Sequence, residues 1–152
     1  MRDFESELQN TIVQIVGSFK RSMSQVMKQQ GWDLSPLHFL IIRSIHLIEG
    51  CTPNTLSNYL KKDKAQITRL LNPLLKQGIV QKIANPNDKR SQYLTLTDKG
   101  LEWYTVLQAS DLETLAAMRK GISDEELAQF LLIGEKMAGN LERAADESSG
   151  LD

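Results

Sequence analysis

Hydrophobic residues recur every three to four positions along most of the chain, with polar residues between them. This spacing is typical of helices that bury one face. It predicts helices over residues 4–27, 36–50, 53–60, 63–77, 98–119 and 124–143. Residues 79–84 and 91–96 flank a loop of turn-forming residues and are predicted to pair as two strands. The predicted fold class is mainly α with a small β-hairpin.

Several helix ends carry capping residues. Thr52 stands before Pro53, and Ser123 stands three residues before Glu126, which are the patterns of a capped first turn and of a capping box. Gly78 follows the fourth helix, where a glycine can adopt the left-handed conformation that ends a helix. Residues 148–152 are expected to form a tail, with fraying from residue 144 onward.

The third and fourth helices are separated by a few residues, which is the pattern of a helix-turn-helix. In the third helix, Leu56, Tyr59 and Leu60 are expected to face inward. The outer face of the fourth helix is polar and basic, and it carries Ala65, Gln66, Arg69, Asn72 and Lys76, with Thr68 at its margin. Long basic and amide side chains on one face suit base edges and phosphates.

Pro73 lies inside the fourth helix and has no N–H to donate to the carbonyl of Arg69. A kink is therefore expected there. The favoured interpretation is structural, a bend on the outward side that leaves the core closed. The functional alternative is that the kink limits the segment that enters a major groove to residues 64–72.

Charge is strongly segregated, although the whole chain has 18 basic and 19 acidic residues. Residues 61–90 contain eight basic and two acidic residues, whereas the rest of the chain contains ten basic and 17 acidic. The loop between the two strands ends in Lys89 and Arg90. A basic hairpin beside a basic helix indicates a wing, and the segregation indicates one face that meets nucleic acid.

The chain resembles the winged helix-turn-helix core of the MarR family of transcriptional regulators at residues 67–71, 74–75, 78–80, 88–90 and 94–100, together with Leu56, Ser57 and Leu60 of the third helix. The chain departs from the family pattern at Gln81 and Lys82, where an arginine is frequent, and at Pro73. The resemblance implies a single domain over residues 1–147. Its DNA-binding lobe would span about 35–100, and dimerisation helices would span about 4–30 and 101–147.

The apolar stripes of the first and last helices are not needed by a winged-helix core, so they must be buried elsewhere. A homodimer that pairs these helices is the economical solution, and the resemblance implies the same. The alternative is that the helices fold back on their own chain. In a dimer, the two recognition helices would enter successive major grooves roughly 34 Å apart on a pseudo-palindromic operator in double-stranded DNA.

Roles follow from side-chain chemistry. The residues expected to read bases are Gln66, Thr68, Arg69 and Asn72. Those expected to meet phosphates are Thr52, Asn54, Ser57, Lys62, Lys64 and Lys76. In the wing, Arg90 is expected in the minor groove beside Lys89, and Asp88 is expected to orient Arg90 or to stiffen the loop.

The resemblance also implies repression, with release by a small aromatic or phenolic ligand. The candidate effector pocket consists of Phe19, Met23, Met27, Phe39 and Trp103. The same residues are typical of an ordinary core.

Competing functions have weaker support. No nucleophile motif, phosphate-binding loop or dinucleotide fingerprint is present, so an enzyme is not expected. The spacing of His38 and His46 is not that of metal ligands, and neither a metal nor a cofactor is expected. A winged helix that binds a protein rather than DNA, and a redox sensor based on Cys51, remain alternatives. With no apolar run long enough to span a membrane and no signal peptide, a cytoplasmic location away from membranes is expected.

Overall fold

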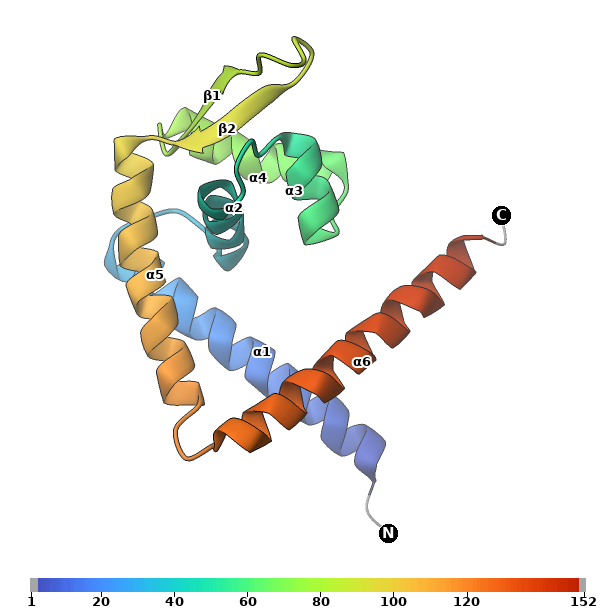
Figure 1. Cartoon of the computed structure of the whole chain (residues 1–152). Helices are drawn as coiled ribbons and strands as arrows, with labels where there is room; N and C mark the ends of the chain where they lie inside the picture. Colours follow the sequence, from blue (N-terminus) through green and yellow to red (C-terminus); the bar gives the residue numbers. More distant parts are fainter. Residues whose placement is uncertain (1–2, 151–152) are drawn as a thin grey trace. The chain divides into compact units, whose positions relative to one another are not determined.

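The computed structural model describes residues 3–150 (Figure 1). Within that range the elements are α1 (Phe4–Gln29), α2 (Pro36–Leu47), α3 (Pro53–Leu60), α4 (Lys64–Lys76), β1 (Val80–Ala84), β2 (Gln92–Leu96), α5 (Asp98–Met118) and α6 (Asp124–Ser149). The prediction of a mainly α chain with one hairpin is confirmed.

The hairpin is antiparallel, with Val80 opposite Leu96 and Ala84 opposite Gln92. Each strand starts one residue later than the sequence pattern predicts. The reason lies in the backbone, because the N–H of Ile79 donates to the carbonyl of Leu74 at the end of α4 (2.9 Å). The N–H of Ser91 likewise donates within the loop, to the carbonyl of Asp88 (3.2 Å).

The chain forms two compact units, one up to Thr114 and one from Leu115. The first unit contains the hydrophobic core, which collects apolar side chains from α1 to α5 and from the hairpin. Its buried residues are Met23, Met27, Phe39, Ile41, Ile42, Ile45, Cys51, Leu56, Ile67, Leu71, Leu74, Ile79, Val80, Leu94, Tyr104 and Leu107. This core fixes α4 and the hairpin as one structure.

Capping explains where several helices begin. The N–H of Ser35 donates to Nδ1 of His38 across the first turn of α2 (2.9 Å), so the His38 ring accepts with that nitrogen. Burial lowers the pKa of His38, and the nearby Asp33 carboxylate opposes the shift. In the second unit, the N–H of Ser123 donates to the Glu126 carboxylate (2.8 Å), which confirms the predicted capping box of α6.

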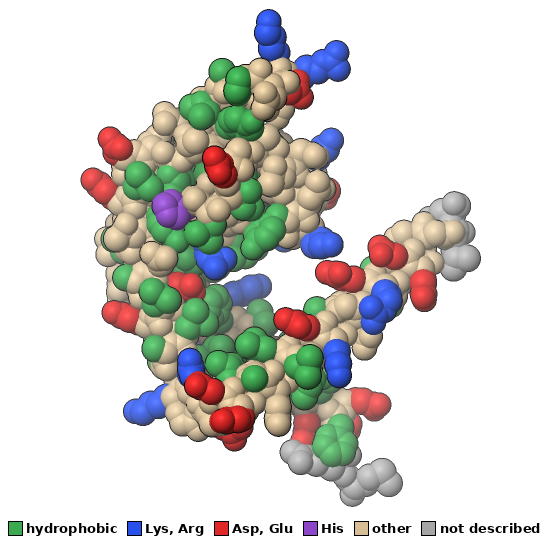
Figure 2. All heavy atoms as spheres, in the orientation of Figure 1, with side chains coloured by type: hydrophobic (Ala, Val, Ile, Leu, Met, Phe, Trp, Pro, Cys, Tyr) green, Lys and Arg blue, Asp and Glu red, His purple; other side chains and the backbone are tan. Residues whose placement is uncertain are grey.

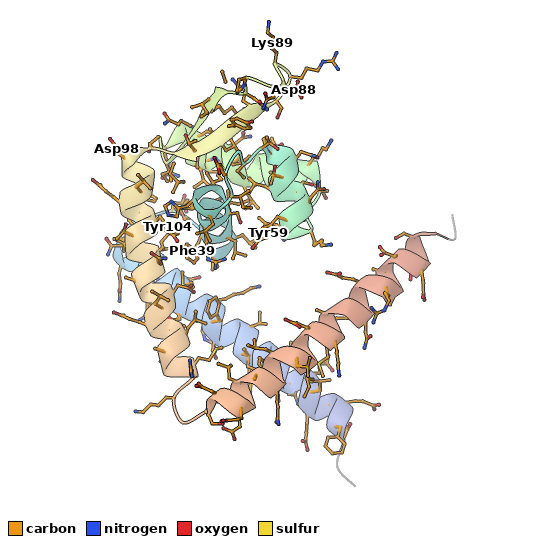
Figure 3. The ribbon with its side chains drawn as sticks, in the orientation of Figure 1. Phe39, Tyr59, Asp88, Lys89, Asp98 and Tyr104 are labelled. Atoms are coloured by element: carbon orange, nitrogen blue, oxygen red, sulfur yellow. The ribbon has the colours of Figure 1, made fainter. Side chains whose placement is uncertain are left out.

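Two sequence expectations are wrong. Tyr59, labelled on α3 in Figure 3, does not face inward but is 58% exposed. The reason is that the short helix α3 contacts the core only through Leu56 and Leu60. The last helix does not fray from residue 144 but continues to Ser149, whose hydroxyl donates to the carbonyl of Ala145 (3.0 Å). The rest of the expected tail, residues 151–152, lies outside the described residues.

Large hydrophobic side chains remain exposed on α1, on the end of α5 and on α6. Figure 2 shows hydrophobic patches at the molecular surface. None of the residues of α6 is buried. The exposed apolar residues of α1, the end of α5 and α6 include Leu8, Ile12, Val13, Val16, Leu112, Leu115, Met118, Phe130, Leu131, Leu132, Ile133, Met137 and Leu141. Each of these helices carries an apolar face that its own unit leaves exposed.

Candidate nucleic-acid interface

The turn between α3 and α4 is closed by hydrogen bonds. Lys61 adopts the left-handed conformation (φ 53°), which reverses the chain after α3. Lys62 donates its N–H to the carbonyl of Ser57 (3.1 Å) and accepts from the Ser57 hydroxyl through its own carbonyl (2.6 Å). The hydroxyl hydrogen of Ser57, which the sequence assigned to a phosphate, is therefore already used in the turn.

The predicted cap of α3 is present. Oγ1 of Thr52 accepts from the N–H of Thr55 (3.1 Å), and the N–H of Thr52 donates to Oγ1 of Thr55 (3.2 Å). Thr52 thus serves the helix, whereas Asn54 on the same first turn is exposed. Of the two, Asn54 is the freer to contact a phosphate.

Helix α4 presents one buried and one exposed face. Ile67, Leu71 and Leu74 are buried in the core, and the opposite face carries the exposed side chains of Gln66, Arg69, Asn72 and Lys76. Asp63 caps the helix by accepting from the N–H of Gln66 (2.8 Å). Thr68 donates its hydroxyl to the carbonyl of Lys64 (2.9 Å), so it can only accept from a base. Gln66, Arg69 and Asn72 keep their side-chain donors available.

Pro73 does not end the helix. Residues on both sides of it belong to the same α-helix, and the N–H of Gln77 donates to the carbonyl of Pro73 (3.0 Å). The kink expected at Pro73 stays a prediction.

The wing loop is stabilised by its own side chains. Oδ1 of Asn85 accepts from the N–H of Asn87, and Oδ1 of Asp88 accepts from the N–H of Arg90, each at 2.9 Å. Asp88 therefore stiffens the loop through its backbone, which is one of its two expected roles. Lys89 and Arg90 are exposed, and Figure 3 shows Asp88 and Lys89 at the tip of the hairpin.

A groove of about 340 Å³ lies between α4 and the hairpin. Lys64, Lys82 and Arg90 line it, together with Pro53, Asn54, Ile67, Thr68, Ser91 and Gln92. Three cations from three separate segments therefore lie beside the exposed face of α4 that carries Gln66, Arg69 and Asn72. No carboxylate is among the residues that line the groove. Such a groove is suited to an anion.

Lys82, Ser91 and Gln92 are groove residues that the sequence analysis did not assign to a site. The strand alternation would have found Lys82, because it lies opposite Leu94 and two residues after the buried Val80, on the same face of the hairpin. Val80 is the only buried residue of β1, so the long Lys82 side chain on that face reaches the groove.

The candidate effector residues do not form one open site. Met23, Met27 and Phe39 are buried in the core, whereas Phe19 and Trp103 are half-buried at its edge. The ring of Trp103 stacks on Trp32, with ring centroids 4.0 Å apart. The effector pocket stays a prediction.

Cys51 is fully buried, and burial raises the pKa of its thiol to about 11. A reactive cysteine needs a thiolate and access to solvent. The structure therefore favours a structural thiol over the redox sensor considered from the sequence. Within residues 3–150 no group of three or more His, Cys, Asp and Glu residues could hold a metal ion. None of the helices in that range combines the length and the hydropathy of a membrane span.

Comparison with known proteins gives consistent results. A family model described as the MarR family matches residues 32–91. The HTH-type transcriptional regulator BilQ of Clostridioides difficile (strain CD3) is 41% identical over 66 residues, which are 43% of this chain and 44% of that protein. The chain thus aligns with less than half of the length of that regulator.

Solved structures extend the match over most of the chain. A MarR protein from Peptoclostridium difficile is 31% identical, with a TM-score of 0.73, and the alignment covers 88% of each chain. The S. aureus MepR–DNA complex gives a TM-score of 0.78 at 19% identity, covering 87% of this chain and 96% of that one. At that identity the likeness shows the shared winged-helix fold.

Proposed function

Because the chain belongs to the MarR family, we propose that it is a transcriptional regulator that binds double-stranded DNA sequence-specifically. The observation that carries the proposal is the exposed face of Gln66, Arg69 and Asn72 on α4, which adjoins a groove lined by cations. Solved relatives include one bound to DNA, the S. aureus MepR–DNA complex.

Base reading is proposed for three residues of α4. Arg69 suits the O6 and N7 acceptors of guanine, and Gln66 and Asn72 suit the N6 and N7 atoms of adenine. Thr68 can accept a hydrogen bond from a base at the margin of this face. These side chains stand on a helix fixed by the core, which gives them a defined register in a major groove.

Phosphate contacts are proposed for the cations around this face. Lys64, Lys82 and Arg90 line the groove, and Asn54 lies beside them. Lys62 and Lys76 flank the two ends of α4, and Lys89 extends from the wing. Since these residues come from several segments, they would contact the phosphate backbone of the DNA along both its major and its minor groove.

A homodimer is the second part of the proposal. The exposed apolar faces of α1, the end of α5 and α6 need a partner, and a second copy of the chain supplies the same faces by two-fold symmetry. Sedimentation should show a dimer at micromolar concentration. Phe130→Glu with Met137→Glu should yield a monomer with weakened DNA binding, whereas Gln129→Glu, which adds charge to a polar position of α6, should not.

Repression and release by a small aromatic acid form the third part. A dimer lying over a promoter excludes polymerase sterically, and a ligand acts only if it binds one spacing of the recognition helices better than another. Phe19 and Trp103 at the edge of the core offer aromatic surface for such a ligand. Repeating the DNA titration with phenolic acids tests this part alone.

The deciding experiment is a fluorescence-anisotropy titration of random duplex at low and moderate salt, followed by selection of bound sites from a random pool. We expect salt-sensitive binding and enrichment of a pseudo-palindrome. Binding that is absent or insensitive to salt would refute the proposal and favour a winged helix that recognises a protein.

A further inference from the structure

The C-terminal end of α4 is held by the segment that starts α5. The carbonyls of Pro73, Leu74 and Leu75 in the last turn of α4 accept from the N–H groups of the three residues that follow the helix. The carbonyls of those three residues are bound in turn from the start of α5. Here the carbonyl of Gln77 accepts from Nζ of Lys99 (2.9 Å). The carbonyl of Gly78 accepts from the Thr97 hydroxyl, and that of Ile79 accepts from the Thr97 N–H (3.1 Å). Three consecutive carbonyls after α4 are thus bound by two residues at the start of α5, Lys99 in its first turn and Thr97 just before it.

Lys99 makes a second contact on its own helix. Its Nζ lies 5.2 Å from the ring centroid of Trp103, within the range of a cation–π interaction. The Trp103 ring stacks on Trp32 with an interplanar angle of 13°. The N–H of Trp32 in turn donates to the carbonyl of Met27 (2.9 Å), in the last turns of α1. A continuous row of contacts therefore runs from the end of α4 through α5 to the end of α1.

The helices at the two ends of this series of contacts, α4 and α1, have different roles in the proposed function. Helix α4 reads DNA, and α1 and α5 belong to the helices proposed to pair the two copies. The angle between α4 and those helices determines how far apart two recognition helices stand in a dimer. We propose that Lys99 and Trp103 are positioning residues that hold α4 on α5 and α1, and thereby set the half-site spacing that the dimer accepts. This inference rests on the proposed function of dimeric DNA binding.

Lys99 is suited to this task because one ammonium group serves two partners. It offers three donors at the end of a flexible stem, so it can bond the Gln77 carbonyl while facing the Trp103 ring. Without it, the bonds of Thr97 to Gly78 and Ile79 remain. The fold should therefore persist, while α4 loses the contact that links its end to Trp103.

A direct phosphate contact is the competing explanation for Lys99, since its side chain is exposed. The two roles differ in their dependence on salt. A lost phosphate contact lowers the slope of log affinity against log salt by about one. A lost positioning contact leaves the slope unchanged and alters the preference for spacing.

The experiment compares Lys99→Met, Lys99→Arg and Trp103→Leu with the wild-type chain and with Lys120→Met, which removes the same charge in the loop between α5 and α6. Affinities are measured by anisotropy for the selected site and for the same site with its half-sites moved by one or two base pairs. Melting temperature and far-ultraviolet circular dichroism show whether the fold is retained in every variant, and near-ultraviolet circular dichroism of the stacked indoles shows whether the Lys99 variants keep the stack.

For Lys99→Met we expect affinity for the selected site to fall about three- to tenfold, with less loss on the altered spacings and an unchanged salt slope. Trp103→Leu should act in the same direction, Lys99→Arg should restore the wild-type preference, and Lys120→Met should equal wild type. Unchanged spacing preference in Lys99→Met, an equal loss on all duplexes, or a slope lower by about one would each overturn the inference. Failure of the wild-type chain to bind any duplex would instead overturn the proposed function.

Discussion

Gly100 packs directly against the carbonyl oxygen of Ile79, so closely that a Cβ atom on Gly100 would lie 2.1 Å from it. The same carbonyl accepts from the N–H of Thr97, and the N–H of Gly100 donates to Oγ1 of Thr97 (3.1 Å). Thr97 and Gly100 thus bring the first turn of α5 against the chain that leaves α4. Glycine is required three residues after Thr97 because any side chain at position 100 would collide with the Ile79 carbonyl.

Gly100→Ala should destabilise the chain by about 2 kcal/mol or more, because the clash is with backbone and neither segment can move without disturbing the core. Denaturant unfolding measures the change. The control is Gly139→Ala in α6, on the face opposite Phe130 and Met137, where a Cβ would meet only the end of the Arg143 side chain at 3.6 Å and alanine favours the helix. Equal stability of the two variants would contradict the packing described here.

Arg69→Ala should reduce affinity for the best site by about 1 to 3 kcal/mol and relax sequence preference, because it removes a base contact. Lys76→Ala should weaken binding to all sequences and lower the salt slope by about one. Anisotropy on specific and random duplex separates the two. Equal loss on both duplexes for Arg69→Ala would refute its base-reading role.

Asp88 can be tested by a pair of variants that remove the same charge. Asp88→Asn keeps the side-chain oxygen that accepts from the Arg90 N–H, whereas Asp88→Ala loses it and frees the wing loop. We expect Asp88→Ala to bind operator more weakly than Asp88→Asn, by about 1 kcal/mol, the usual worth of one hydrogen bond. Indistinguishable affinities would show that the wing needs no such support.

Stability should decrease as pH falls below about 6.5, the ordinary pKa of histidine. The pKa of His38 is lowered in the fold, chiefly by burial, so the unfolded chain takes up a proton more readily than the folded chain. The loss begins at the unfolded pKa and ends below the lowered folded value. Protonation also removes the Nδ1 acceptor for the Ser35 N–H.

The control for this pH dependence is His38→Gln, whose amide oxygen can accept from the Ser35 N–H without titrating. Unfolding free energies measured between pH 5 and pH 8 on the two chains should differ most at the acid end. A wild-type slope that survives in His38→Gln would assign the effect to other groups.

Cys51 should resist alkylation in the folded chain and react only on unfolding, because it is buried and the pKa of its thiol is raised to about 11. Reaction with iodoacetamide followed by mass spectrometry checks this. Peroxide should leave DNA binding unchanged. Rapid modification under native conditions would restore the redox hypothesis.

Local signals predicted the elements well because they depend on neighbours in sequence. Thr52, Gly78 and Ser123 mark helix ends through caps and a left-handed turn, and the structure has a helix boundary at each. The strand ends were less predictable. Strand β1 does not include Ile79, because the Ile79 N–H donates to the carbonyl of Leu74 at the end of α4. This hydrogen bond could not be predicted from the sequence pattern.

The exposure and the hydrogen-bond partners of several side chains depend on tertiary contacts, which the spacing of hydrophobic residues does not predict. Tyr59 lies beside Leu56 on a helical wheel, yet the core reaches only one side of α3, so the ring is exposed. Lys82 belongs to the groove because the hairpin brings it beside Lys64 and Arg90. Similarly, Ser57 and Thr52 look available in the sequence but are occupied by the turn and the cap.

The left-handed Lys61 places a positive charge where glycine would fit the backbone with less strain. An L-residue in that conformation costs roughly 1 to 2 kcal/mol, a cost that glycine avoids. At this one residue, robustness of the fold and attraction for a polyanion therefore pull in opposite directions. Salt screens the attraction of the Lys61 ammonium for a polyanion but leaves the backbone strain unchanged, so the advantage of lysine over glycine at this position should shrink as ionic strength rises.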